Sequence, residues 1–185
     1  MMRPLRKLCR LLREEAGVVF IEMAFVMPVL ILIVTGGTEL ARYVLLNQKL
    51  DRVASTMSDL TSQAETLSTT QLTALFDAVN QVGQPFDITA AGKIYVSSVT
   101  GKSGGTAHVN WQQSSGTLSV SSSIGTAGNN ATLPSGFTLA VDETVIIGEV
   151  FYSYTPLIFN GVVENTQLHH TALFRPRFGT LTSLN

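Results

Sequence analysis

The chain has 185 residues and a formal net charge of −1, which leaves room for one domain plus a membrane segment. Hydrophobic residues make up 45% of it and charged residues only 14%, and the apolar excess lies mostly in one block near the N-terminus. No basic stripe suited to phosphates follows that block, so we predict no nucleic-acid partner. The only cysteine is Cys9, so no intramolecular disulfide can form.

Charge is distributed unevenly along the chain. Residues 1–17 contain five Lys or Arg and two Glu, a net charge of +3, whereas residues 43–185 contain six basic and nine acidic residues, a net charge of −3. Basic segments beside a membrane helix stay in the cytoplasm. We therefore predict that residues 1–17 form a cytoplasmic leader and that the C-terminal part lies on the other side of the membrane.

A long apolar run follows the leader, with the sequence AGVVFIEMAFVMPVLILIVTGGT from Ala16 to Thr38. About 20 apolar residues in a helix span the ~30 Å hydrocarbon layer of a bilayer. The run has no polar face, which argues against a core helix of a soluble bundle. We predict a transmembrane helix over residues 18–38, and Pro28 is expected to kink it without ending it.

The single ionisable residue of this run is Glu22. An ionised carboxylate in a membrane helix costs at least about 2.5–3.5 kcal/mol, so a paired and functional residue is one interpretation. The other is a hydrated carboxylate near the headgroups. Gly17, four apolar residues and Glu22, behind a basic leader, resemble the processing site of type IV pilin-like proteins. In that family a membrane prepilin peptidase cuts after the glycine, which implies a mature chain that begins at Val18. Glu22 would then lie about one helical turn from the new amine, on its own or on a neighbouring chain.

Residues 39–84 are predicted to form an amphipathic helical stalk and a second helix. Apolar residues recur at steps of three and four, the pattern of a helical packing seam. The seam consists of Tyr43, Leu46, Leu50, Val53, Met57, Leu60, Ala64 and Leu67. It fits packing against the chain's own domain and packing against a partner helix equally well. Ser68 and Gln71 match a capping box that begins the second helix, which Gly83 and Pro85 end.

From residue 85 to residue 185 the hydrophobic period changes to two, which predicts an antiparallel β-rich head. The predicted strands are Lys93–Thr100, Thr106–Gln113, Gly116–Ser123, Thr138–Val141, Glu143–Tyr154 and Leu168–Phe174. Segments rich in Gly, Ser, Asn and Thr separate them.

The motifs of the head point to no chemistry. Gly101-Lys102-Ser103 lacks the upstream glycine of a phosphate-binding loop, since position 96 is Val96. His169 and His170 are adjacent, and adjacent strand residues point to opposite faces, so they are poorly placed to bind one metal ion. We predict no cofactor, no metal site and no enzymatic activity.

Two further segments carry a more specific resemblance. The run from Ile147 to Leu157, with Glu149, Tyr152, Tyr154 and Pro156, resembles the "EV-x-Y-x-Y-x-PL" segment of TadE-like minor pseudopilins from tight-adherence (Flp) pilus systems. Phe174-Arg175-Pro176-Arg177 resembles the C-terminal part of the same group. Met23 is a departure, because Tyr or Phe is common after the glutamate.

The fold expected from these patterns is α+β: a long N-terminal membrane helix, an amphipathic stalk and a small antiparallel β-rich head, as in pilins. The resemblance implies a minor pseudopilin of the bacterial inner membrane with a periplasmic head. Such a protein takes part in assembly of adhesive pili with a prepilin peptidase and other pilins or pseudopilins. The alternative is a single-pass anchored envelope protein whose β domain binds a partner or ligand unrelated to pili.

Overall fold

The computed structural model describes residues 15–158, 160 and 164–185, and the side chains from residue 17 onward within that range. Residues 1–14 of the predicted leader thus lie outside the described residues. Two compact units make up the chain, Met1–Tyr43 and Val44–Asn185. Helix α2 (Glu15–Ser62) supplies the described part of the first unit and the first helical segment of the second.

Helix α2 runs for 48 residues and continues through Pro28, as expected for a membrane helix. Helix α3 (Thr69–Gly83) begins at the predicted capping box. The Ser68 side chain accepts a hydrogen bond from the backbone N–H of Gln71, and the Gln71 side chain accepts one from the backbone N–H of Ser68. The short helix α4 (Ile88–Ala91), which the sequence pattern did not predict, is capped by Asp87.

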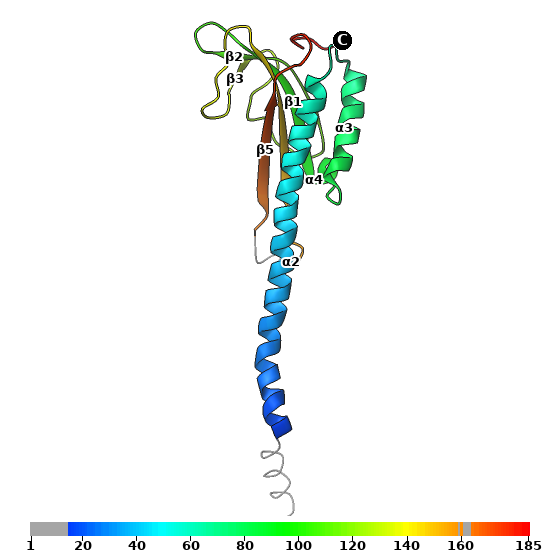
Figure 1. Cartoon of the computed structure of the whole chain (residues 1–185), viewed down its shortest axis with the longest axis vertical. Helices are drawn as coiled ribbons and strands as arrows, with labels where there is room; N and C mark the ends of the chain where they lie inside the picture. Colours follow the sequence, from blue (N-terminus) through cyan, green and yellow to red (C-terminus); the bar gives the residue numbers. More distant parts are fainter. Residues whose placement is uncertain (1–14, 159, 161–163) are drawn as a thin grey trace, which may run out of the picture. The chain divides into compact units, whose positions relative to one another are not determined.

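Five antiparallel strands form one sheet in the order β3-β2-β1-β4-β5 (Figure 1). Their bounds are Gly92–Gly101 for β1, Ala107–Ser115 for β2, Asn130–Ala131 for β3, Thr144–Tyr154 for β4 and Thr166–Phe174 for β5. Strands β1, β2, β4 and β5 match four predicted strands to within a few residues. The α+β fold with an antiparallel head is therefore confirmed.

Two predicted strands are wrong. Gly116–Ser123 has the alternation of a strand but belongs to none of the strands β1 to β5. An edge was available, since β3 pairs with β2 only at Ala107 and His108, but the chain leaves the direction of β2 at Gly116, whose φ is 113°. This segment is instead held by single hydrogen bonds, such as that from the Leu118 N–H to the Gly92 carbonyl (3.1 Å). Thr138–Val141 is an irregular segment whose Leu139 packs on the sheet.

The two faces of the sheet are covered differently. The C-terminal part of α2 packs on one face, where Ser58 Oγ donates a hydrogen bond to the Ala172 carbonyl of β5 (3.1 Å). On the other face, the segment between β2 and β4 packs over Val99, Val109, Val145 and Ile147 through residues such as Ile124 and Phe137. Side chains alternate between the faces along each strand, so β4 is buried on both sides.

Candidate functional site

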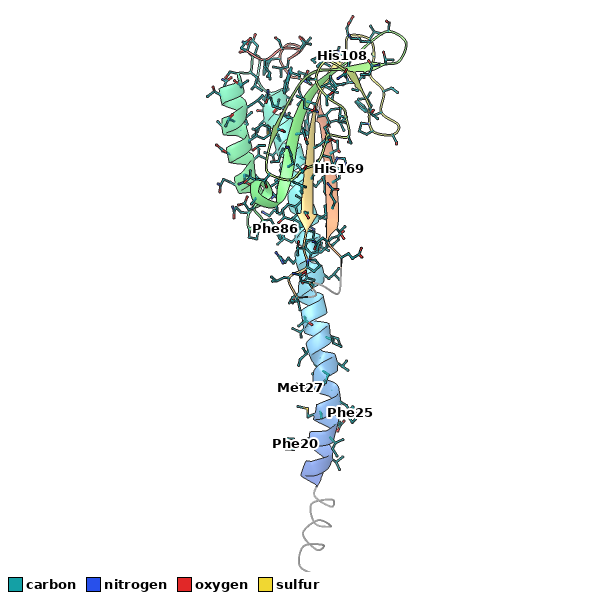
Figure 2. The ribbon with its side chains drawn as sticks, turned by 180° about the vertical axis from the view of Figure 1, so that it is seen from behind. Phe20, Phe25, Met27, Phe86, His108 and His169 are labelled. Carbon is teal, nitrogen blue, oxygen red and sulfur yellow. The ribbon has the colours of Figure 1, made fainter. Side chains whose placement is uncertain are left out.

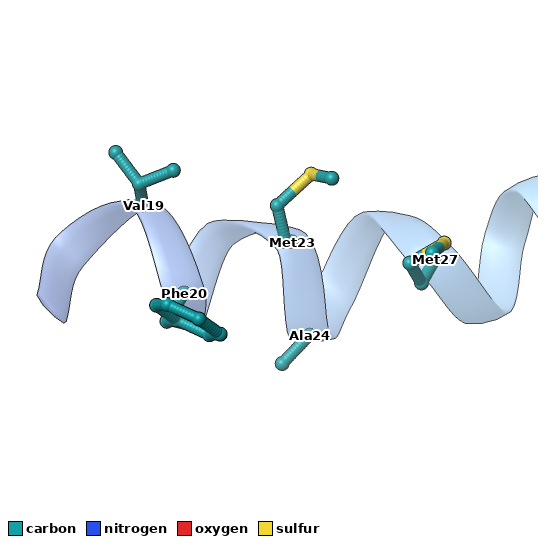
Figure 3. A pocket seen from close by; sticks show the side chains of 5 residues that line it. All are labelled: Val19, Phe20, Met23, Ala24 and Met27. Atoms are coloured by element: carbon teal, nitrogen blue, oxygen red, sulfur yellow. The ribbon is translucent and has the colours of Figure 1, made fainter. Parts of the chain in front are cut away.

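The apolar part of α2 presents its side chains to the outside. Among the described residues, one helix, within Gly17–Ser62, is long and apolar enough to cross a membrane, and its most apolar stretch is not buried in the protein. Phe20 and Phe25 are each more than three-quarters exposed, and Figure 2 shows them projecting from the helix with Met27. Val19, Phe20, Met23, Ala24 and Met27 line an open apolar hollow along one side (Figure 3). A surface of this kind is stable in lipid and not in water.

The three residues of the proposed processing site lie at the beginning of this helix. Gly17 and Val18 are in its first turn, and Glu22 follows Val18 by four residues, which is close to one turn. The side chain of Glu22 is exposed among apolar neighbours. The helix therefore presents a carboxylate one turn from the backbone nitrogen that cleavage after Gly17 would release.

The stalk seam faces the interior of the head. Leu46, Leu50, Val53 and Met57 are fully buried. Val53 lies beside Gly83 of α3, and the amine of Lys49, on the same helix, donates a hydrogen bond to the Val82 carbonyl (3.3 Å). Of the two interpretations of the seam, packing against the chain's own domain is the one observed from Leu46 to Met57. Tyr43 belongs to the first unit. Further along the seam, Leu60 and Ala64 are half-buried and Leu67 is buried.

A glycine in the family-like segment sets how closely α2 approaches the sheet. A methyl group at Gly148 would lie 2.8 Å from the Ala54 carbonyl oxygen of α2 and closer still to Ser58 Oγ. Only a residue without a side chain fits between strand and helix at this point. The close approach also lets Ser58 reach β5, so the Gly148 position joins three elements.

The aromatic residues of the same segment pack on both faces of β4. Tyr152 meets Phe86 edge-on, with ring centroids 6.5 Å apart, whereas Phe151 stacks on the His169 ring at 4.2 Å. Tyr154 and Pro156 are buried where β4 ends. These contacts are those of a packed core, in which offset and edge-on ring pairs are favourable.

Glu149, also in the segment, is a fully buried carboxylate with four hydrogen-bond contacts from three residues. It accepts hydrogen bonds from the hydroxyls of Ser122 and Ser123, and from the backbone N–H of Ser123 at 3.1 Å. The Nε2 atom of His169 lies 3.2 Å from Oε1 of the same carboxylate. Burial and the Glu149 charge raise the pKa of the neighbouring Tyr95. A buried carboxylate is stable only when satisfied in this way, so Glu149 fastens the Ser122–Ser123 segment to the sheet.

The sequence reasoning included Glu149 through the resemblance but missed its serine partners. The available signal was a lone glutamate in the otherwise apolar strand VIIGEVFY, because such a residue needs local donors. The serines lie 26 and 27 residues away along the chain, at the end of the Gly116–Ser123 segment, which forms no strand and therefore has no ladder register against β4. The sequence spacing between these serines and Glu149 therefore could not predict their contact.

The two adjacent histidines point to opposite faces, as predicted. His169 contacts Glu149 on one face, whereas His170 Nε2 lies 3.2 Å from Asn47 Oδ1 of α2 on the other. Among the described residues, no group of three or more His, Cys, Asp or Glu side chains is placed to hold a metal ion.

His170 should make the stability of the head depend on pH. Burial lowers its pKa, partly offset by Asp51, whose carboxylate lies 4.0 Å away, and the charge of His169 lowers it further. Since the unfolded chain then binds a proton first, stability should be complete above about pH 6.5 and fall as the pH drops below it. The unfolding midpoint of the purified protein, measured between about pH 7.5 and 5.5, should show this slope. His170→Asn should flatten the slope and His108→Asn should leave it; an unchanged slope in His170→Asn would contradict the assignment.

Comparison with known proteins bears on the helix and not on the head. Residues 17–57 match the family model described as TadE-like protein. No curated protein and no solved structure matches the chain. The matched segment begins at Gly17, includes Glu22 and ends within the buried seam. The resemblance to TadE-like proteins is thereby confirmed over residues 17–57, the part of the apolar helix and stalk that the family model covers.

Proposed function

We propose that this protein is a minor pseudopilin that takes part in the assembly of tight-adherence pili. The observation that carries the proposal is the TadE-like match over residues 17–57, because it coincides with an exposed apolar helix that has Gly17 and Glu22 at pilin spacing. In this role the chain is a structural component and not an enzyme. Its N-terminus lies in the cytoplasm, its helix in the inner membrane and its head in the periplasm.

The two halves of α2 have different surfaces, and this difference supports the role. From Leu46 to Met57 the seam residues are buried against the head of the same chain, so a partner helix cannot pack on that face. From Val18 to Val34 the apolar side chains are exposed. Association with other pilins or pseudopilins therefore uses the apolar half, in the membrane or in a filament. Glu22 pairs there with the amine of a processed chain, since a low-dielectric environment strengthens the attraction.

Processing of the leader tests the proposal. Co-expression with the prepilin peptidase of a tight-adherence system should convert the chain to a form that lacks residues 1–17, which intact mass measurement of the membrane extract would detect. Gly17→Leu should abolish cleavage, because a side chain would obstruct the scissile bond. Gly36→Leu is the matched control: no atom lies within 4 Å of a methyl group at that position, so cleavage should persist.

Glu22→Gln separates cleavage from assembly. The variant should still be cleaved but should fail to support pilus formation, since the amide cannot pair with the new amine as an ion. Persistence of full-length wild-type chain beside an active peptidase would contradict the proposal. The alternative of an anchored envelope protein, with a head that binds an unrelated partner, would then be the better account.

A further inference from the structure

Strand β5 is the last strand at one side of the sheet, and its outer edge is open (Figure 1). It pairs with β4 over all nine residues, from Thr166 to Phe174, without a shift in register. Among the described residues, no backbone group outside β4 bonds to it. An open edge of this kind presents a row of backbone N–H and C=O groups with which a further strand can pair.

The contacts of Ser58 indicate which residues of β5 face outward. Its Oγ atom lies over Gly148 of β4, where a methyl group would collide with it, and it also donates to the Ala172 carbonyl of β5 (3.1 Å). Because Gly148 and Ala172 are directly paired, this carbonyl points toward β4. Backbone groups alternate in direction along an antiparallel strand. The residues whose N–H and C=O groups point to the open edge are therefore Gln167, His169, Thr171 and Leu173.

This edge lacks the features that keep sheet edges from pairing. Such features are a very short strand, a bulge, a proline or a charged side chain, above all lysine. From Thr166 to Phe174 there is no bulge, no proline and no Asp, Glu, Lys or Arg. The opposite edge of the sheet differs, because β3 has only two residues and the Val109 backbone of β2 bonds to Gly128 and Asn129 in the loop before β3. The fold thus partly shields one edge and leaves the other open.

The side chains along β5 define the chemistry of a segment that fits it. His169 and His170, on opposite faces, are 36% and 24% exposed, and Gln167 is exposed. An added strand would cover these groups on both faces, so an uncharged strand fits best, since a covered charge loses hydration. The exposed carboxylate of Glu164, two residues before β5, favours a basic residue at the adjoining end of the added strand.

Two-fold pairing with a second copy does not fit an anchored chain. The open edge that a second head offers is its own β5, and two-fold pairing of β5 with β5 is antiparallel. Within the head, α2 runs along β5, with Asn47 at His170 and Ser58 at Ala172. The two Val44 ends, each joined directly to its anchoring helix, would then lie at opposite ends of the pair. A segment that adds to β5 therefore comes from another protein.

We propose that the open edge of β5 is a docking site for an extended segment of another protein, which adds to the five-stranded sheet as one more strand. The segment is uncharged over the nine residues of β5. It runs antiparallel to β5, the more stable arrangement, and has a basic residue at its C-terminal end. Backbone hydrogen bonds to the outward residues hold it, as in other cases of strand addition to a sheet edge. This contact is in the head and does not depend on the association of apolar helices proposed above.

A synthetic peptide tests the edge of the full-length protein in detergent micelles. The probe alternates threonine and valine over the length of β5 and ends in lysine. It is N-methylated at every second residue, so one of its edges can pair and the other cannot, which prevents the peptide from stacking on itself. The control peptide is N-methylated at every residue and has no backbone donor. Hydrogen exchange of single amides, measured by mass spectrometry with electron-transfer fragmentation, shows where each peptide binds.

The probe should slow exchange of the outward amides by at least about tenfold, and the control peptide should not. Gln167→Pro removes an outward N–H and none that bonds to β4, so it should weaken binding at least about fivefold. Gln167→Ala keeps the N–H and should bind as the wild type does. Trp111 fluorescence checks that both variants are folded.

Three results would overturn the proposal. The first is unchanged exchange at all four outward amides, and the second is wild-type binding by Gln167→Pro, which would place the peptide elsewhere. The third is protection of the outward amides without peptide, together with a doubled protein mass in the micelle, which would identify a second copy as the occupant.

Discussion

Replacing Leu50 with aspartate should leave no folded head. Leu50 is fully buried where α2 packs against the rest of its unit. The substitution removes about 2–3 kcal/mol of stabilisation from apolar burial. It also places an unpaired charge in the core, which costs several kcal/mol more. Small domains are stable by only about 5–15 kcal/mol. The measurement is the amount of protease-resistant protein in membrane extracts, together with the emission of Trp111, whose Nε1 donates to the Leu181 carbonyl (2.7 Å).

Two further variants make the effect quantitative. Leu50→Ala should fold but lose about 3 kcal/mol of unfolding free energy in detergent, since a large buried side chain leaves a cavity. Leu45→Ala, the same change in an exposed position of the same helix, should lose less than about 1 kcal/mol. Equal losses at positions 45 and 50 would show that the seam is not part of the core, and a partner helix would again be a candidate for it.

Replacing Glu149 with glutamine should destabilise the head by about 2 kcal/mol. The amide keeps the shape of the carboxylate, but it lacks the charge and presents two hydrogens where the wild type has only acceptors. The groups of Ser122, Ser123 and His169 that contact the carboxylate would then lose part of their hydrogen bonding. Denaturant unfolding followed by Trp111 fluorescence measures the loss.

Local hydrogen exchange distinguishes this effect from a general one. In Glu149→Gln, the backbone amides of Ser123 and Ile124 should exchange faster, because the segment is no longer fastened to β4. The exposed Glu65 supplies the control, and Glu65→Gln should change stability by less than about 0.5 kcal/mol. A Glu149→Gln variant with wild-type stability and wild-type exchange would show that the carboxylate contributes nothing to holding the segment.

Local patterns predicted the elements whose determinants are near in sequence. The capping box at Ser68, the strand alternation around Val96 and the continuous apolar run near Phe25 each depend on residues within a few turns of one another. The alternation at Gly116–Ser123 is equally clear, but the strand it predicted is absent, because a strand also needs a partner strand beside it. Where the chain runs after the turn at Gly116 is decided by the tertiary structure and not by the alternation.

By itself, the sequence determined the membrane-length helix, the resemblance carried by Gly17 and Glu22, and the antiparallel head. Apolar length, glycine-to-carboxylate spacing and a period of two are all readable along the chain. Only the tertiary structure decided which surface the stalk seam covers, because an apolar seam fits any complementary surface. It also decided the partners of Glu149 and the contacts of β5 with α2 at Asn47 and Ser58. Those contacts join residues that are 26 to more than 100 positions apart in the chain. Strand pairing and helix packing bring such residues together, and no local sequence pattern predicts them.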